Sequence, residues 1–279
     1  MGKTGSLASL ANAGYRLFIY DFDNGLDALA RYVQPEFKKN VYFKTYGDKL
    51  KAGKRKFIGS HGLVAMVPSA VPDGTPTAFA NFLSDLDDWK EGDVSMGSIR
   101  TWGPKDVAVF DTLTFMSDAA MRLILDLNKI EHPRVQDYGT LGEIMLPVFE
   151  VIKSPEVKCN LVVITHIKVI GGEDDKPGAP PPMAYPNALG QMVPRKIGSY
   201  FNCIASCRQI GSGPSARRII NTETDPEIGL KSPAPPNLIP RELPLSTGLA
   251  DYFKLLKDAA KAPPATSASV VTPVQPPKV

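Results

Sequence analysis

The first residues of the chain have the composition of a phosphate-binding loop. Gly2, Lys3, Thr4 and Gly5 stand directly before an apolar segment that should be helical. In such a loop the backbone amides surround phosphate oxygens, the lysine reaches the outer phosphates and the hydroxyl binds Mg²⁺. A complete loop also has a strand and further glycines upstream, which we expect before Met1. Because the short motif occurs often by chance, an N-terminal segment without a ligand is the alternative.

Carboxylates follow two apolar segments that are expected to be buried strands. Asp21 and Asp23 come after Leu17–Tyr20, and Asp111 comes after Val107–Phe110. Ligands bind beyond the carboxyl ends of the strands in a parallel sheet, so these side chains are site candidates. A carboxylate that ends a fully apolar strand is costly to bury without a cation or several donors, which predicts a Mg²⁺ ligand at Asp111. Asp21 and Asp23 have a second interpretation as caps of the following helix.

A third apolar segment also ends in polar side chains. Leu161–Ile164 is followed by Thr165 and His166. We expect His166 at the same edge of the sheet as Asp111, where it could donate a hydrogen bond to a phosphate. A structural histidine with satisfied hydrogen bonds is the alternative.

The elements that must position these residues alternate along the chain. Short apolar runs rich in β-branched and aromatic residues predict the three strands. Helical segments are expected around Leu7–Ala13, Thr77–Trp89, Ala119–Asn128, Gly142–Lys153 and Leu249–Ala260. This alternation predicts an α/β fold in which helices flank both faces of a mainly parallel sheet.

The C-terminal third has a different pattern. Tyr200–Ile210 and Ala216–Thr222 are expected to form an antiparallel extension of the sheet, joined by a turn rich in glycine. The Gly- and Pro-rich stretch Gly171–Pro186 predicts a long loop. Residues 261–279 are mostly Pro, Ala, Ser, Thr and Val and predict a disordered tail, which leaves one domain over residues 1–260.

A basic segment is the main candidate for nucleic-acid binding. Eight lysines and arginines lie between Lys38 and Lys56, against a single acidic residue, Asp48. Aromatic residues are interleaved with them at Tyr42, Phe43 and Tyr46. Such cations could hold phosphates and such rings could stack bases, with Lys54, Arg55 and Lys56 as the candidate contacts. A solvated strand edge protected by lysines is the alternative.

Composition excludes several classes of protein. The chain has 279 residues, 43% hydrophobic and 22% charged, which fits one domain with appendages. No apolar run is long enough to span a bilayer and no signal sequence is recognisable, so no membrane partner and a cytoplasmic location are expected. Three cysteines and three histidines favour neither a disulfide framework nor a zinc site. The net charge of +3 does not by itself indicate a polyanion partner.

The order of these features resembles the RecA-like P-loop ATPases. A lysine loop is followed by an acidic strand end, a strand that ends in Asp111 and a strand with a polar end. The resemblance is closest to the RecA-type ATPases of bacteriophages, which include the Sak-type single-strand annealing ATPases, and covers roughly Gly2 to Ala260. It implies that Lys3 and Thr4 hold phosphates and Mg²⁺, and that Asp111 holds Mg²⁺ through water. It also implies that the first strand and the first half of the P-loop are missing from residues 1–260.

The resemblance implies roles for further residues. RecA has a glutamate general base where this chain has Asp23, which is one methylene shorter. His166 takes the place of a glutamine that senses the γ-phosphate. Lys231 is similar in position to lysines that RecA subunits insert into a neighbour's ATP site, which implies a homo-oligomer; a surface lysine is the alternative. Gly171–Pro186 falls where RecA has a DNA-binding loop, although its acidic residues oppose phosphate binding.

The sequence thus predicts Mg²⁺-dependent ATP binding and hydrolysis coupled to the handling of single-stranded DNA in phage-type recombination or replication. The location would be the host cytoplasm if a phage encodes the protein. One alternative is a DNA-binding or annealing protein of the same fold that does not hydrolyse ATP. A third hypothesis, a small-molecule kinase, is disfavoured because the adjacent Arg217 and Arg218 would face opposite ways on a strand.

Overall fold

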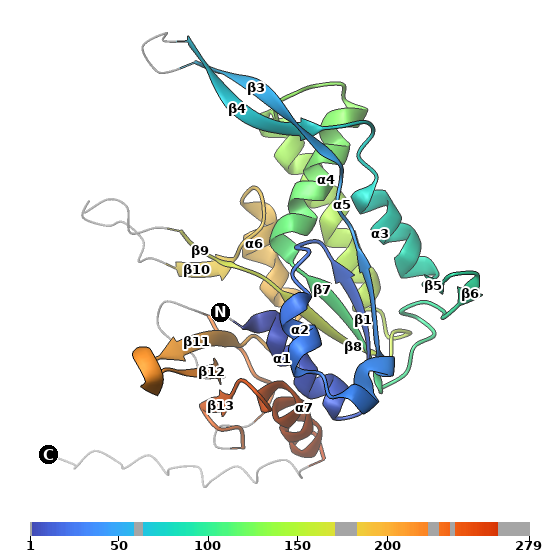
Figure 1. Cartoon of the computed structure of the whole chain (residues 1–279), viewed down its shortest axis with the longest axis vertical. Coiled ribbons are helices and arrows are strands. Elements are labelled where there is room, and N and C mark those ends of the chain that lie inside the picture. The colour runs from blue at the N-terminus through green and yellow to red at the C-terminus, as the bar shows by residue number, and fades with distance from the viewer. Residues whose placement is uncertain (1, 59–63, 171–182, 223–228, 235–237, 262–279) are drawn as a thin grey trace, which may run out of the picture.

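A parallel sheet lies at the centre of the molecule. The computed structural model describes residues 2–58, 64–170, 183–222, 229–234 and 238–261. The strands of this sheet are β1 (Arg16–Asp21), β2 (Val41–Thr45), β7 (Asp106–Asp111) and β8 (Asn160–Ile164). Their order is β2-β1-β7-β8, and every neighbouring pair is parallel (Figure 1). The predicted α/β class with a parallel sheet is confirmed.

Helices lie on both faces of this sheet (Figure 1). They are α1 (Lys3–Asn12), α2 (Asp27–Tyr32), α3 (Ala78–Asp87), α4 (Leu113–Leu127), α5 (Val135–Ile152), α6 (Met192–Ile197) and α7 (Gly248–Ala259). Short 3₁₀ turns occur at η1 (Pro35–Asn40), η2 (Gly198–Tyr200) and η3 (Gly213–Ser215). All five predicted helical segments overlap one of these helices. None of the described helices is long and apolar enough to cross a membrane.

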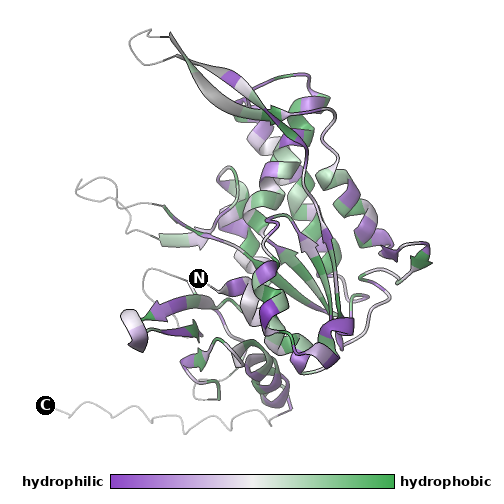
Figure 2. Ribbon diagram, in the orientation of Figure 1, coloured by the Kyte–Doolittle hydropathy of each residue, from purple (hydrophilic) through white to green (hydrophobic). Residues whose placement is uncertain are grey.

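The two faces of the sheet form two cores because side chains alternate along each strand. Phe18 and Tyr20 of β1 lie in a core with residues of α3, α4 and α5. Leu17 and Ile19 lie in the other core, with residues of α1 and α2. Hydrophobic residues accordingly fill the central strands and hydrophilic residues are frequent on the outer helix surfaces (Figure 2).

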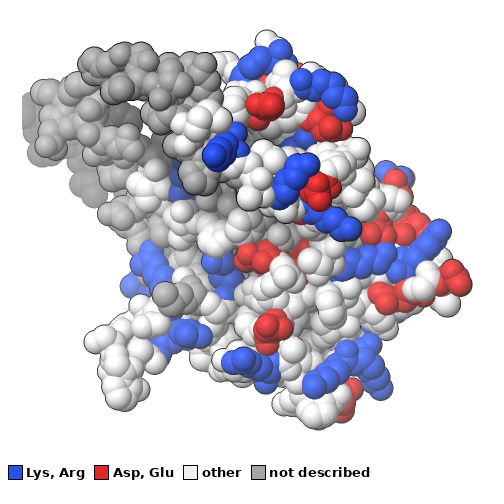
Figure 3. Space-filling view, turned by 45° about the horizontal axis from the view of Figure 1, so that its top comes forward, with Lys and Arg blue, Asp and Glu red and all other residues white. Residues whose placement is uncertain are grey.

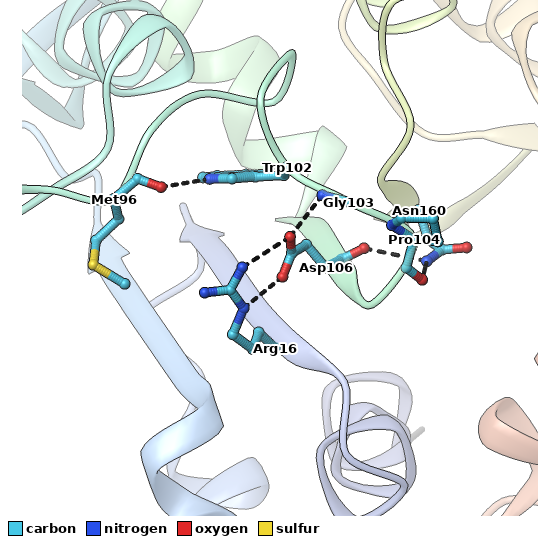
Figure 4. A network of polar contacts seen from close by, with 7 residues as sticks. All are labelled: Arg16, Met96, Trp102, Gly103, Pro104, Asp106 and Asn160. Atoms are coloured by element: carbon cyan, nitrogen blue, oxygen red, sulfur yellow. Dashed lines mark hydrogen bonds and ion pairs between the residues drawn. The ribbon is translucent and has the colours of Figure 1, made fainter.

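An ion pair fixes the amino ends of the central strands. The Arg16 guanidinium donates to both carboxylate oxygens of Asp106, at 2.6 and 3.0 Å, and the Gly103 amide donates to the same carboxylate at 2.7 Å (Figure 4). Asn160 donates to the backbone oxygens of Pro104 and Asp106, which connects β8 to the same network. The carboxyl edge, where the candidate residues lie, is at the opposite end of these strands.

Antiparallel hairpins of the described chain lie outside this sheet. β3 (Leu50–Ile58) and β4 (Val64–Pro72) form an arm that projects from the body (Figure 1). β5 (Lys90–Glu91) pairs with β6 (Val94–Ser95). β9 (Ile167–Ile170) pairs with β10 (Met183–Pro186), so the last residues expected in the long loop form a strand. Residues 171–182 of that loop and residues 262–279 of the expected tail lie outside the described residues.

The predicted C-terminal antiparallel pair forms, but it does not extend the parallel sheet. β11 (Ser206–Ile210), β12 (Arg217–Asn221) and β13 (Glu242–Pro244) make a separate three-stranded sheet. The reason is its packing partner. Ile220 and Leu243 of this sheet pack on Tyr252 of α7 in a small core of their own.

Candidate functional site

The N-terminal end of α1 offers free backbone amides at the carboxyl edge of the sheet. Gly2 is the N-cap residue, with a φ of 88°, and no side chain caps the first turn. Glycine is favoured here because other residues rarely adopt this positive φ, and a Cβ at this position would also displace the end of the Leu245 side chain. Unsatisfied amides and the helix dipole make such a helix end favourable for an anion.

A hydrogen bond joins this helix end to β7. The Thr4 hydroxyl donates to Asp111 Oδ2 at 2.7 Å. The Asp111 side chain is fully buried, and its Oδ1 has no hydrogen-bond partner among the described residues. A buried carboxylate oxygen without a donor is costly, so this geometry favours a cation next to Asp111.

The surroundings of Asp111 disfavour its charge when no cation is bound. The pKa of Asp111 is raised to about 6: burial is the largest cause and the negative charges of Asp21 and Asp23 add to it, while the Thr4 hydrogen bond and Lys3 oppose it. A divalent cation would reverse this balance by stabilising the carboxylate.

Asp21 and Asp23 lie at the end of β1 but have different environments. Asp21 pairs in register with Asp111, and its Oδ1 accepts the backbone amides of Asp23 and Asn24 at 3.0 and 2.8 Å. Burial raises the Asp21 pKa, and these amides lower it. Asp23 is exposed and forms no ion pair with another described residue. Neither caps α2, whose first turn has no side-chain cap, so the helix-capping interpretation is wrong; Asp21 instead binds the turn after β1.

His166 lies beside the N-terminal end of α4. Its Nδ1 is 3.2 Å from Thr114 Oγ1, and the Thr114 hydroxyl donates its own proton to the Asn187 carbonyl. This contact holds the ring of His166 against the first turn of α4.

No family model, curated protein or solved structure matches this chain.

Arg218 is a candidate that the sequence analysis missed. Its Nη1 lies 3.6 Å from the position that a Cβ on Gly2 would occupy, which places the guanidinium beside the start of α1. Arg217, its neighbour on β12, points elsewhere and pairs with Glu242 at 3.0 Å. The alternation of the two arginines along a strand was visible in the sequence. That β12 packs next to α1 was not, because the two segments are far apart in the chain.

Within the described residues, no contact joins Lys231 to Asp111. Its backbone pairs with Ile204 in an isolated antiparallel bridge, and its side chain is exposed. A role in a neighbouring subunit's site stays a prediction.

The basic segment does not form one surface. Lys44 pairs with Asp85, and Tyr46 is buried and donates to the same carboxylate at 2.7 Å. Tyr42 stacks on Phe18. These residues belong to the body because β2 is a strand of the central sheet, so Tyr42 and Tyr46 are not available to stack bases.

Lys38 and Lys39 lie in η1, and the remaining basic residues of the segment lie in or directly before the β3–β4 arm. Lys49, Lys51 and Lys54 are exposed, although Lys51 forms an ion pair with Asp73 at 3.1 Å. Arg55 and Lys56 are in β3, and their side chains lie outside the described residues. On the face visible in Figure 3, basic and acidic side chains are interspersed.

The donor set fits a Mg²⁺ ion that is shared with phosphates. Among the described residues, no cluster of three His, Cys, Asp or Glu side chains could hold a metal alone. Mg²⁺ commonly binds one or two protein oxygens and completes its shell with water and substrate phosphates. The Thr4 hydroxyl and the free Oδ1 of Asp111 supply such oxygens next to an anion-binding helix end.

Proposed function

We propose that this chain is a RecA-like P-loop ATPase domain that binds ATP and Mg²⁺ at the carboxyl edge of its parallel sheet. The observation on which the proposal depends is the hydrogen bond between Thr4 and Asp111. It places the hydroxyl of the loop motif and the carboxylate of a buried strand end at one point, next to free helix amides. If the short motif were present only by chance, no contact between Thr4 and Asp111 would be expected.

Each residue of the site has a defined task in this proposal. Lys3 and the first-turn amides of α1 hold the phosphates. Thr4 and Asp111 hold Mg²⁺, which neutralises charge on the phosphates when it is bound. Asp23, exposed at the end of β1, orients the attacking water and accepts its proton. Arg218 adds a positive charge beside Gly2, and His166 donates a hydrogen bond to the outer phosphate.

Replacement of Lys3 tests the proposal directly. Lys3→Ala should weaken binding of ATP with Mg²⁺ by about 10- to 100-fold, because hydrogen bonds to charged groups contribute roughly 1.5–3 kcal/mol. Calorimetry or a fluorescent nucleotide measures the change. The matched control is Lys105→Ala, an exposed lysine just before β7 at the other edge of the sheet. Equal affinities of the parent and Lys3→Ala would exclude the P-loop assignment.

We also propose single-stranded DNA as the partner, bound through the β3–β4 arm. The support is local: the arm projects from the body and has exposed lysines at Lys49 and Lys54 (Figure 1). ATP hydrolysis at the sheet edge would then be coupled to movement or release of the strand in phage-type recombination or replication.

The salt dependence of DNA binding tests this partner. Replacement of Lys54, Arg55 and Lys56 by serine should make the negative slope of log K against log salt shallower by about two to three units. Each phosphate contact in a single strand contributes ~0.7 to the size of this slope. Filter binding or anisotropy over a range of salt measures the slope. Serine at Lys38 and Lys39, which are in η1 outside the arm, is the control. An unchanged slope in the arm variant would mean that these residues form a solvated strand edge and do not contact DNA.

A further inference from the structure

Both strands of the β3–β4 arm lead into contacts of one carboxylate, Asp48. Asp48 stands just before β3, and Thr77 and Ala78 follow shortly after β4. Asp48 Oδ1 accepts the backbone amides of Thr77 and Ala78 at 2.9 and 3.0 Å. The Asp73 amide donates to the Lys49 carbonyl at 2.7 Å and closes the arm at the same place. Asp48 therefore fixes the base of the arm to the start of α3.

The other oxygen of Asp48 faces α4. The Arg122 guanidinium lies 3.5 Å from Asp48 Oδ2, and this oxygen forms no hydrogen bond with the described residues. The Asp48 side chain is only 3% exposed, whereas that of Arg122 is 31% exposed. Because a buried carboxylate oxygen normally has a donor, this long contact satisfies Asp48 incompletely. The ion pair is therefore weakly held, and a second arrangement of Arg122 can compete with it.

Asp118 is a second carboxylate within reach of Arg122. It lies at the i, i+4 spacing on α4, and residues at this spacing are neighbours on a helix surface. Asp118 is half-buried; burial raises its pKa, and the charge of Arg122 lowers it. Arg122 thus lies between a carboxylate of its own helix and the carboxylate at the base of the arm.

α4 connects Arg122 to the candidate site (Figure 1). The helix begins at Leu113, directly after Asp111 and Thr112, and its first turn contains Thr114, which contacts His166. Coupling between distant sites can be carried by a rigid element that has two discrete arrangements. A change of partner at Arg122 can therefore reach the residues around Asp111 through this one helix.

We propose that Arg122 is a positioning residue that couples the arm to the ATP site by exchanging between Asp48 and Asp118. Paired with Asp48, it joins α4 to the base of the arm; paired with Asp118, it releases the arm from α4. Nucleic acid on the arm and ATP with Mg²⁺ at Asp111 each favour one of these arrangements, so each ligand changes the affinity for the other by the same factor. The coupling rests on the proposed function, whereas the exchange is a property of the ligand-free chain.

Urea unfolding of the ligand-free protein tests the exchange. Asp48→Asn retains an oxygen for the amides of α3, and Asp118→Asn removes the other carboxylate. Because Arg122 can move to the carboxylate that remains, the double variant should have a lower unfolding midpoint than the sum of the two single shifts predicts. In an Arg122→Gln background the two replacements should be additive. Additive shifts with Arg122 in place would overturn the exchange, whether or not the protein binds ATP or DNA.

The affinity for single-stranded DNA, measured with and without Mg²⁺ and a non-hydrolysable ATP analogue, tests the coupling. In the unmodified protein the two affinities should differ by about 5- to 150-fold, the usual range of allosteric coupling. Asp48→Asn leaves Arg122 with Asp118, and Asp118→Asn leaves it with Asp48. The two variants should therefore bind DNA at opposite limits of the unmodified protein's range, and the analogue should change neither affinity by more than about twofold.

Asp73→Asn is the matched control for the DNA measurement. Asp73 also lies at the base of the arm, where it pairs with Lys51 at 3.1 Å, so its replacement removes the same charge from an ion pair within the arm. It should shift both DNA affinities equally and preserve their ratio.

The outcomes separate the coupling from the proposed function. If the unmodified protein binds both ligands but the analogue leaves its DNA affinity unchanged, the coupling is wrong. The same holds if the analogue acts on Asp48→Asn and Asp118→Asn as strongly as on the unmodified protein. If the unmodified protein binds neither ATP nor DNA, the proposed function fails, and the unfolding measurement still decides whether Arg122 exchanges its partner.

Discussion

Asp111→Asn should abolish most Mg²⁺-dependent ATP hydrolysis while making the ligand-free protein more stable. The asparagine keeps an acceptor for the Thr4 hydroxyl but removes the charge that would hold the cation. A loss of about two to three orders of magnitude in turnover is expected, because metal stabilisation of the transition state is worth several kcal/mol. Steady-state hydrolysis over a range of Mg²⁺ concentrations measures this loss.

The stability change has the opposite sign because of the raised pKa of Asp111. Its value of about 6 means that the folded protein retains this proton at a higher pH than the unfolded chain does. Ionisation therefore costs stability progressively as pH rises from about 4 to 6, and above that range the cost is roughly 2–3 kcal/mol. Asparagine avoids this cost, so denaturant unfolding should show a gain that is small at pH 4 and largest above pH 6.

Asp106→Asn is the matched control for both measurements. Asp106 is the first residue of β7 and Asp111 the last, and both are buried. Asp106 is paired with Arg16, so its replacement should lower stability and leave nucleotide binding and Mg²⁺ dependence intact. If Asp111→Asn hydrolyses ATP as fast as the parent, the Mg²⁺ role of Asp111 is wrong.

Asp23→Asn should reduce turnover by about two to four orders of magnitude with ATP affinity unchanged, because a positioned base contributes that much. The side chain is exposed, so the fold should be unaffected. Asp23→Glu should retain or raise turnover, since it restores the longer carboxylate that RecA has. Single-turnover hydrolysis together with nucleotide binding separates the two effects.

Asp21→Asn distinguishes the base from its neighbour. Asp21 binds two backbone amides of the turn after β1, so its replacement should cost stability rather than chemistry. If Asp23→Asn keeps full turnover and Asp21→Asn loses it, the general base is Asp21 and not Asp23. If the unmodified protein and both variants are equally inactive in hydrolysis, the protein is better described as a binding protein of the same fold that does not hydrolyse ATP.

The sequence predicted the parts of the site that depend on short apolar strands. Val107–Phe110 could only be a buried strand, and a carboxylate at its end therefore lies at the sheet edge. The meeting of Asp21 with Asp111 follows from the parallel pairing of β1 and β7. These features are local in sequence or are fixed by the direction of the strands.

The sequence did not predict features that depend on packing between distant segments. Tyr46 was a candidate for stacking on bases, yet it is buried against Phe82 and donates to Asp85. Arg218 reaches Gly2 because the C-terminal sheet folds back towards α1. No local pattern in β8 or in the C-terminal strands specifies that those strands form a separate sheet.

The position of the two tryptophans makes intrinsic fluorescence a selective reporter. Trp89 and Trp102, the only tryptophans in the sequence, are almost completely buried in the core shared with α3, α4 and α5. Trp102 stacks on Phe18 with ring centroids 3.9 Å apart, and its indole donates to Met96 within the network at the amino ends of the strands (Figure 4). Neither indole lies among the candidate residues at the carboxyl edge. A red shift of the emission during a nucleotide titration would therefore signal opening of this core rather than occupancy of the site.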